Sequence, residues 1–370
     1  MKTLLLILLA LPLFQSFAQA QEICAQVFEQ DHSMARRFLN QELDTIQTLF
    51  ADSKHLSDDQ KLKLLMNEEV RKNFFRLQGL SQMVMAQNTK FFAKKTSNFK
   101  DWQGVFGDYD LAVSLRKVAV KIDEPVLEPY FRAKELQAKE VLLQTMKESG
   151  LWESPEQTIR LLKAELDKKG RWSEDKKERK FLIENLRDRA EEVQKGIKAG
   201  AFDSPDIEKG LHRLRRQLRS LLIQVNALKG LVELQPETDL PTGINGWFNE
   251  LLAQNPKLMN SKYTKSSEIL VEQPIKVPQY EFSIISELAG TIGDYKDVAE
   301  TQIYFKEALE SIGASPVYIQ QVQSKIQRHF KIEPFDHQEM SRGIQNRLAQ
   351  TKLLKHYIKG LKTMNEPKKL

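Results

Sequence analysis

From Ser204 to Val225 the chain reads SPDIEKGLHRLRRQLRSLLIQV, and the order of its residues is typical of a helix. A serine, a proline and an acid indicate a first helical turn, because the hydroxyl caps free amides and the acid faces the positive end of the helix dipole. Apolar residues then recur at spacings of three and four, which places them on one face. They are Leu211, Leu214, Leu218, Leu221, Leu222 and Val225. The segment predicts an amphipathic helix that begins at Ser204.

The rest of the chain has the same character. Long stretches are rich in Leu, Lys, Glu, Gln, Arg and Ala, which favour helices, and Pro and Gly are sparse inside them. No alternating apolar and polar pattern of useful length indicates a strand. Helix breaks are expected at residues 57–59, 124–125, 169–170, 202–205, 236–238, 274–278 and 333–336. We predict an all-α protein of roughly ten to twelve helices.

Two short segments of the chain resemble each other. Residues 101–109 read DWQGVFGDY and residues 287–295 read ELAGTIGDY, so both contain Gly-x-x-Gly-Asp-Tyr. A helical pattern follows each of them, which is typical of a duplicated structural unit. Glycines spaced by three allow helices to approach closely or to end in a left-handed turn, and the acid can cap another helix. We expect tight corners between helices at both places, and two pseudo-repeated antiparallel helical bundles.

The beginning of the chain has the three parts of a secretory signal peptide. Lys2 supplies the positive charge, residues 4–17 form an apolar run, and residues 18–20 (Ala-Gln-Ala) form a small-x-small cleavage site. The run is shorter than the ~20 residues that a transmembrane helix needs, and no later stretch is a better candidate. We expect cleavage after Ala20 and a periplasmic or secreted protein without a membrane span. Cys24 is the only cysteine, which excludes an intrachain disulfide.

The expected organisation has three parts. A signal peptide covers residues 1–20, a first helical bundle half covers residues 21–200, and a second half covers residues 201–370. The second half contains an irregular stretch at residues 233–279, where prolines and glycines are concentrated. Long segments without regular structure are uncommon inside compact domains, so we expect an insertion or a flexible excursion there.

The overall charge is nearly balanced, with 56 Lys and Arg against 50 Asp and Glu. An excess of this size does not by itself predict nucleic-acid binding, so an anion site has to come from local clustering of cations. Stacking of bases would need aromatic side chains among the basic ones, and the four tryptophans are scattered along the chain. Nucleic acid is therefore not a favoured partner.

Four nitrogen-bearing side chains lie opposite the apolar face of the 204–225 helix, at spacings i, i+3, i+4 and i+7. They are His212, Arg215, Arg216 and Arg219, and we call them the His212 stripe. No acidic residue is interleaved with them, so no neighbour in the stripe relieves their mutual repulsion. Guanidinium groups at this spacing can hold successive oxyanions with paired hydrogen bonds, and the histidine can add a donor or a charge as the pH falls.

The last predicted helix repeats this spacing with a second set of basic residues. They are Lys352, Lys355, His356 and Lys359, and we call them the C-terminal stripe. A lysine stripe is usually just a solvated helix face. Alternatively, the two stripes face a common groove and form an anion channel that needs no high net charge.

The His212 stripe, followed by residues 290–294 (Gly-Thr-Ile-Gly-Asp), resembles the CHAD domain, the conserved-histidine α-helical domain. Proteins of that family are similar two-bundle helical proteins that bind inorganic polyphosphate. The resemblance implies that the His212 stripe is the ligand set of the second half, and that Arg71 and Lys72 match it in the first half. The first half departs from the pattern, because Glu68 stands where a histidine is expected and Phe75 stands where the last arginine would fall.

Signatures of catalysis and of cofactors are missing from the sequence. The six histidines form no i, i+3 or i+4 pair of the kind that binds metal on a helix, and Cys24 has no cysteine partner. No Gly-x-Ser-x-Gly motif indicates a hydrolase. We expect a non-catalytic protein, without metal or cofactor, that binds polyphosphate or another polyanion. The alternative is an exported scaffold without an anion site, on which a partner protein docks in helix grooves.

Overall fold

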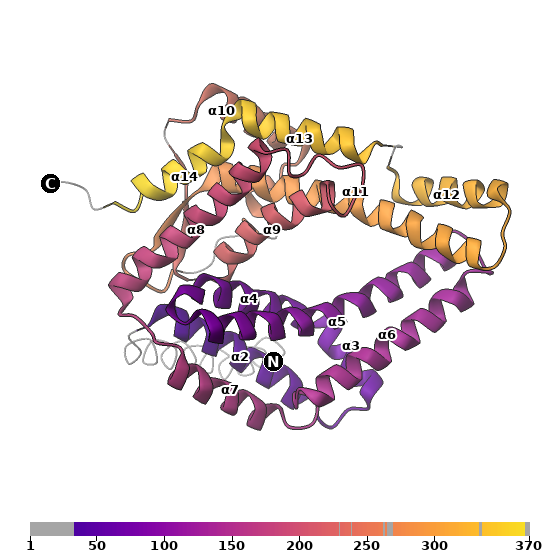
Figure 1. Cartoon of the computed structure of the whole chain (residues 1–370), viewed down its shortest axis with the longest axis horizontal. Helices are drawn as coiled ribbons and strands as arrows, with labels where there is room; N and C mark the ends of the chain where they lie inside the picture. Colours follow the sequence, from indigo (N-terminus) through magenta and orange to yellow (C-terminus); the bar gives the residue numbers. More distant parts are fainter. Residues whose placement is uncertain are drawn as a thin grey trace, which may run out of the picture.

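The computed structural model describes residues 33–366, apart from residues 229, 238, 262, 265–268 and 333–334. Most of this part of the chain is helical, so the predicted all-α class is confirmed (Figure 1). None of the helices in it combines the length and the apolar run that crossing a membrane requires. The expected signal peptide and Cys24 lie outside the described residues.

The helices form two groups, one below the other in Figure 1. The first group contains α2 (Met34–Asp52), α3 (Asp58–Asn67), α4 (Val70–Met83), η1 (Met85–Gln87), α5 (Thr89–Lys121), α6 (Glu128–Glu148) and α7 (Pro155–Lys169). The second group contains α8 (Asp175–Lys198), α9 (Leu211–Ala227), α10 (Thr242–Gln254), η2 (Leu258–Asn260), α11 (Gln279–Ser311), α12 (Pro316–Phe330), α13 (His337–Thr351) and α14 (Leu353–Thr363).

The two groups meet where α4 packs against α9. Gly79 of α4 allows this close approach, because a Cβ atom at that position would lie 3.1 Å from Cγ2 of Ile223. Buried side chains of both helices, such as Phe74 and Leu218, belong to one continuous apolar core. Burial of this shared core stabilises the contact between the groups by the hydrophobic effect.

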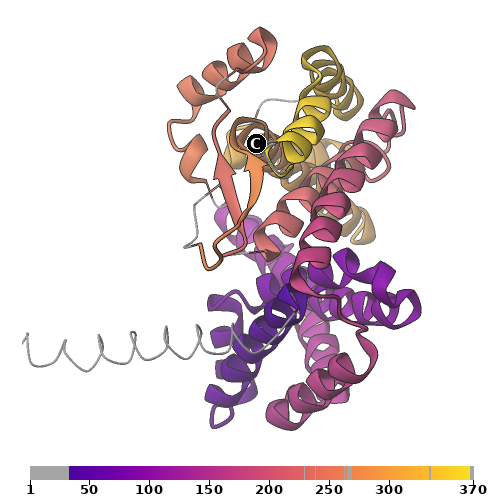
Figure 2. The ribbon, with the colours of Figure 1, turned by 90° about the vertical axis from the view of Figure 1, so that its left-hand side faces the viewer.

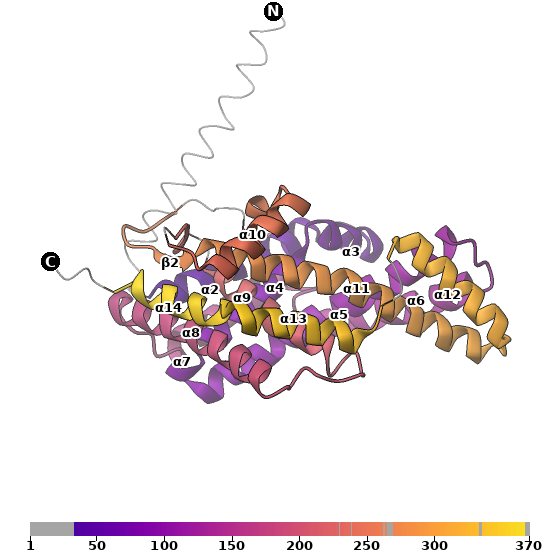
Figure 3. The same ribbon diagram turned by 90° about the horizontal axis from the view of Figure 1, so that it is seen from above.

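Helix α8 lies in the second group, although its residues precede position 200. It packs mainly against α14 and α9. Seen from above, α13 and α14 follow one another along α8 and α9 (Figure 3). The passage from one group to the other therefore falls between α7 and α8, ahead of the boundary expected at residue 200.

The long helices α5 and α11 extend away from the centre as two arms, with α6 packed along α5 and α12 along α11 (Figure 1). The ends of the arms touch through a second apolar cluster, in which the rings of Phe131 and Phe305 lie 4.7 Å apart. The buried carboxylate of Glu124 accepts a hydrogen bond from Tyr318 and pairs with Lys325 at 2.6 Å. The arms are thus joined at their ends as well as at the centre.

The stretch expected to be irregular contains regular structure in its described residues. Strands β1 (Val232–Gln235) and β2 (Ile275–Pro278) form a parallel pair, and α10 lies in the connection between them (Figure 2). Parallel strands need a long crossover, usually helical, which α10 provides. Strands of this length, bounded by prolines, produce no alternating pattern long enough to predict.

Helix α9 begins at Leu211 and not at Ser204. The residues before it form turns, because the carboxylate of Asp206 accepts hydrogen bonds from the amides of Glu208 and Lys209 and so competes with helical bonding. Gly210 precedes the helix, and a Cβ atom there would lie 2.5 Å from the carbonyl oxygen of Ser204. The predicted apolar face is correct, since all six of its residues are buried.

The expected corners at the two Gly-x-x-Gly-Asp-Tyr segments are wrong. Residues 104–109 lie inside α5 and residues 290–295 lie inside α11, and both helices continue through them. The second glycine of each segment makes room for an arginine side chain, which is described below. This glycine therefore lets a side chain approach the helix closely, and it does not form a turn.

Candidate anion-binding site

A cavity of about 320 Å³ lies beside the contact between α4 and α9, with α5 and α8 at its edges. We call it the basic cavity. Its lining residues are Arg71, Phe75, Gln78, Gly79, Gln82, Lys100, Gln103, Arg189, His212, Arg216, Arg219, Ser220, Ile223 and Gln224. Five of these carry a permanent positive charge and none is acidic, so the field inside the cavity favours an anion.

Three members of the His212 stripe line the basic cavity, namely His212, Arg216 and Arg219. The fourth, Arg215, points toward α11, where its Nε donates to the carbonyl oxygen of Ala289 at 3.1 Å. It lies against Gly293, since a Cβ atom there would be 2.7 Å from its Nη2. Burial lowers the pKa of Arg215. Arg215 therefore joins α9 to α11 and does not face the cavity.

Arg71 of α4 is arranged like Arg215, but it also reaches the basic cavity. Its guanidinium lies against Gly107 of α5, where a Cβ atom would collide with it. Burial is the main cause that lowers the pKa of Arg71, and the nearby charge of Arg219 adds to it. Lys72, its neighbour in the predicted set, pairs with Glu69 and is not among the lining residues.

Phe75 occupies the place where the resemblance led us to expect a cation, and it positions two of them. The Cζ atom of Arg219 lies 4.3 Å from the ring centroid of Phe75, and that of Arg71 lies 5.4 Å from it. A guanidinium over an aromatic face gains ~0.5–2 kcal/mol. The ring therefore holds both guanidinium groups beside the cavity without neutralising them.

Several residues that line the basic cavity have a buried polar atom without a hydrogen-bond partner. These atoms are Nε of Arg71, Nε of Arg219, Oε1 of Gln103 and Oε1 of Gln224. In the described part of the chain, no carboxylate lies within 4.0 Å of the Arg219 guanidinium. Buried polar groups are usually hydrogen-bonded, so the two Nε–H donors are suited to the oxygens of a bound anion.

Acidic residues pair with the cations at the rim of the basic cavity. Glu208 accepts from Nδ1 of His212 at 2.6 Å and lies 3.7 Å from Arg216. Glu192 pairs with Arg189 at 2.6 Å. Burial lowers the pKa of His212, although Glu208 acts in the opposite direction. The stripe is partly neutralised at its beginning and unpaired at Arg219.

The C-terminal stripe does not share this cavity. Lys352 is the junction between α13 and α14, in a left-handed conformation with φ of 55°. None of the four members belongs to the described lining of the basic cavity. The apolar face of α14 packs on α8 and β2 through residues such as Leu354 and Leu361. Among the described residues, the two stripes therefore share neither the basic cavity nor the cavity between the two arms.

Several polar lining residues were not predicted from the sequence, among them three from α5 and α8. Lys100 and Gln103 come from α5, and Arg189 comes from α8. Nε of Arg189 donates to the hydroxyl of Ser220 on α9 at 3.1 Å, which ties α8 to this site. Lys100 and Arg189 belong to no local motif, and only the tertiary fold brings them beside α9.

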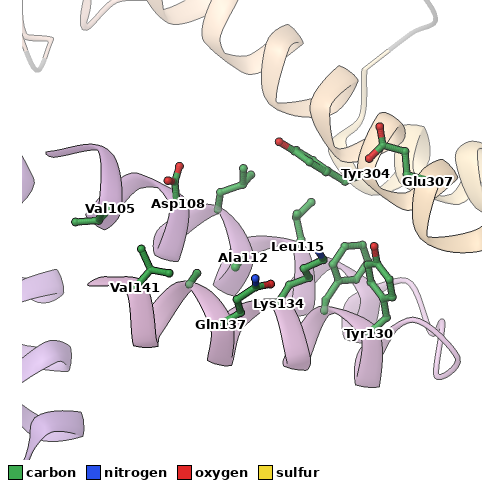
Figure 4. A pocket seen from close by; sticks show the side chains of 13 residues that line it. Val105, Asp108, Ala112, Leu115, Tyr130, Lys134, Gln137, Val141, Tyr304 and Glu307 are labelled. Atoms are coloured by element: carbon green, nitrogen blue, oxygen red, sulfur yellow. The ribbon is translucent and has the colours of Figure 1, made fainter. Parts of the chain in front are cut away.

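A second cavity, of about 340 Å³, lies between the two arms (Figure 4). Leu115 of α5 and Tyr130 and Val141 of α6 line it, and Tyr304 and Glu307 of α11 face them from the other arm. Its lining is mainly apolar, and Val141 is 50% exposed. We call it the arm cavity. It offers little to fix a polyanion, since Lys134 is its one basic lining residue among those described.

Comparison of the chain with protein-family models, with curated proteins and with solved structures finds no match.

Proposed function

We propose that the protein is a non-catalytic module that binds inorganic polyphosphate or another linear polyanion in the basic cavity. The observation that carries this proposal is the pair of buried, unpartnered Nε atoms of Arg71 and Arg219 in a cavity whose described lining holds no acid. A buried group without its hydrogen bond costs ~1–3 kcal/mol, and a phosphate oxygen would supply the missing acceptor.

The proposal includes export and an origin by duplication. The signal-peptide pattern of residues 1–20 supports secretion to the periplasm or beyond. The contacts of Arg71 with Gly107 and of Arg215 with Gly293 support two related halves, because the glycines hold the same place in the two Gly-x-x-Gly-Asp-Tyr segments. These two arginine–glycine contacts also agree with a divergent relationship to the CHAD domain.

The test is a titration of the purified protein with polyphosphate at two salt concentrations. Binding to a linear polyanion releases counterions, so the affinity should fall steeply with salt. The double variant Arg216→Gln/Arg219→Gln should lose at least about a hundredfold in affinity, since a hydrogen bond to a charged group contributes ~1.5–3 kcal/mol.

The matched control is Lys355→Gln/Lys359→Gln, which removes the same charge from α14. It should retain nearly the affinity of the wild type, and circular dichroism should show unchanged helicity in both variants. If the two double variants lose affinity equally, the basic cavity is not the binding site.

The second candidate function is a scaffold that binds a partner polypeptide, and the arm cavity favours it. Two of its large lining side chains are exposed, Val141 of α6 and Tyr304 of α11. Such a groove can accept the apolar face of a helix. Val141→Asp should then remove a salt-resistant complex with a purified partner, while polyphosphate affinity stays unchanged.

A further inference from the structure

Three side chains with metal-binding atoms meet at the rim of the basic cavity. Glu208 precedes α9, His212 lies in its first turn, and Glu300 comes from α11. Nδ1 of His212 and one carboxylate oxygen of each glutamate lie within 4.8 Å of one another. The sequence shows no helical histidine pair, but the fold adds Glu300 as a ligand from a distant segment.

Each carboxylate of this cluster pairs with a cation through its second oxygen. Oε2 of Glu300 lies 2.6 Å from Nζ of Lys296, and Oε2 of Glu208 lies 3.7 Å from the guanidinium of Arg216. The side chains of His212 and Glu300 are each 16% exposed. Partners of this kind orient metal ligands before the metal binds.

The spacing suits a transition-metal cation after small side-chain movements. Nδ1 of His212 is 2.6 Å from Glu208 and 4.0 Å from Glu300. Metal bonds of about 2.0–2.2 Å to nitrogen and oxygen require ligand atoms separated by roughly 3.3 Å. The distance from His212 to Glu208 has to increase, and the distance from His212 to Glu300 has to decrease. Side-chain rotation of the partly exposed Glu208 is enough for the increase.

We propose that Glu208, His212 and Glu300 bind one divalent transition-metal cation such as Zn²⁺, and that an open coordination position of this cation accepts an oxygen of the polyanion. Three protein ligands leave such a position free in zinc sites. His212 also lines the basic cavity, so the open position lies within reach of an anion beside Arg216. This second part rests on the proposed polyanion function.

The charges around the cluster determine how tightly the cation binds. Lys296 and Arg216 offset most of the charge of the two carboxylates and of Asp297, which shares Lys296, so a divalent cation alone leaves the group with a net positive charge. A bound polyanion relieves the repulsion that results. The cation and the anion therefore strengthen each other's binding, and by linkage the two effects are equal.

The first experiment is calorimetric titration of the full chain with Zn²⁺ alone. We expect one site, and at least a tenfold loss of affinity in Glu300→Gln. Glu192→Gln is the matched control, because Glu192 pairs with Arg189 away from the cluster, and it should bind Zn²⁺ like the wild type. Equal Zn²⁺ affinity in the wild type and in Glu300→Gln would overturn the metal site.

The second experiment compares polyphosphate affinity of the wild type and Glu300→Gln with chelator and with Zn²⁺. Polyphosphate itself chelates Zn²⁺, but this affects both proteins alike. With chelator, Glu300→Gln should bind polyphosphate at least as well as the wild type, because a negative charge is gone. With Zn²⁺, the wild type should bind polyphosphate several-fold better than Glu300→Gln. If this order does not reverse, the cation does not contact the anion.

Arg219→Gln separates the two proposals. It should lose polyphosphate affinity and keep its affinity for Zn²⁺ alone, since Arg219 lies outside the cluster. Loss of Zn²⁺ binding in Arg219→Gln would contradict the assigned ligands. Unchanged polyphosphate binding in Arg219→Gln, together with retained Zn²⁺ binding, would contradict the proposed function and leave the metal site standing.

Discussion

The helix pairs α4–α5 and α9–α11 are built alike, but their arginines lie differently. In each pair an arginine of the shorter helix lies on a glycine of the longer one, Arg71 on Gly107 and Arg215 on Gly293. Arg71 then reaches the basic cavity, whereas Arg215 bonds to the backbone of α11. One turn further along, α4 has Phe75 where α9 has Arg219. The two helices are therefore complementary, and they enclose one asymmetric cavity.

Replacing one arginine from each side should reveal this asymmetry most strongly. Arg219→Gln should weaken polyphosphate binding by about tenfold to a hundredfold, because a hydrogen bond to a charged group contributes ~1.5–3 kcal/mol. Arg71→Gln should cost less, since Asp110 lies 3.8 Å from its guanidinium and already offsets part of its charge. Calorimetric titration would measure both. Equal losses would contradict the asymmetric cavity.

The two long helices should also differ in how pH affects them. Beside the start of α5, Lys169 of α7 and Lys95 of α5 bond to Glu165 of α7 and lower its pKa to about 2. Near the start of α11, burial and the adjacent Glu237 raise the pKa of Glu281 to about 9. The first carboxylate stabilises the fold above its unfolded pKa of 4.5, and this contribution is lost toward pH 2.

The effect of Glu281 on stability changes with pH in the opposite direction. The folded protein keeps the proton that the unfolded chain releases above pH 4.5, so stability falls as the pH rises toward 9. Glu281→Gln keeps the group neutral, and we expect its melting temperature at pH 9 to exceed that of the wild type by at least about 3 °C. At pH 5 the two should nearly coincide. A melting curve at each pH checks this, and a lower melting temperature of the variant at pH 9 would contradict it.

The paired glycines allow a sharper comparison. Gly107→Ala should push Arg71 away from its place beside the cavity and lower polyphosphate affinity about threefold to tenfold, which corresponds to ~0.7–1.4 kcal/mol. Gly293→Ala displaces Arg215, which does not line the cavity, so the affinity should stay within about twofold. Both changes favour the helix by ~1 kcal/mol, which protects the fold. An equal loss in the two variants would mean that Arg215 also contacts the anion.

The smallest effect is expected at Phe75. Phe75→Leu removes the aromatic face under Arg219 and should lower polyphosphate affinity about twofold to fivefold, in line with ~0.5–1 kcal/mol for a solvent-accessible cation over a ring. Phe75→Tyr keeps that face and should behave like the wild type. If both variants bind normally, the ring does not position Arg219.

The sequence predicts the α9 side of the site because one helix carries its own pattern. The apolar face of α9 is buried as expected, and this orientation directs His212, Arg216 and Arg219 to the opposite side. The spacing could not show that Arg215 turns to α11, because the glycine that receives it lies in another helix. It also could not show which lysine or arginine stripe faces a cavity and which faces solvent.

The missing parts of the site come from long-range packing. Lys100 and Arg189 stand on exposed or half-exposed faces of long charged helices, and nothing in their neighbourhood in the sequence distinguishes them. The start of α9 was misplaced because the side chain of Asp206 bonds to nearby amides as well as a capping residue would. In the sequence, a turn in which an acidic side chain bonds to nearby amides has the same residue pattern as a helix start.

The parallel strands β1 and β2 bear on how freely the chain can vary. Val232 pairs with Ile275 and Gln235 with Pro278, so the end of the α9 segment and the beginning of α11 are held side by side. Because the strands are parallel, the connection between them leaves after Gln235 and returns before Ile275, at opposite ends of the pair. Helix α10 of this connection buries Trp247 and Phe248 in the main core, and the ring of Phe248 packs on Tyr280 of α11, so a change in the connection should also disturb α11.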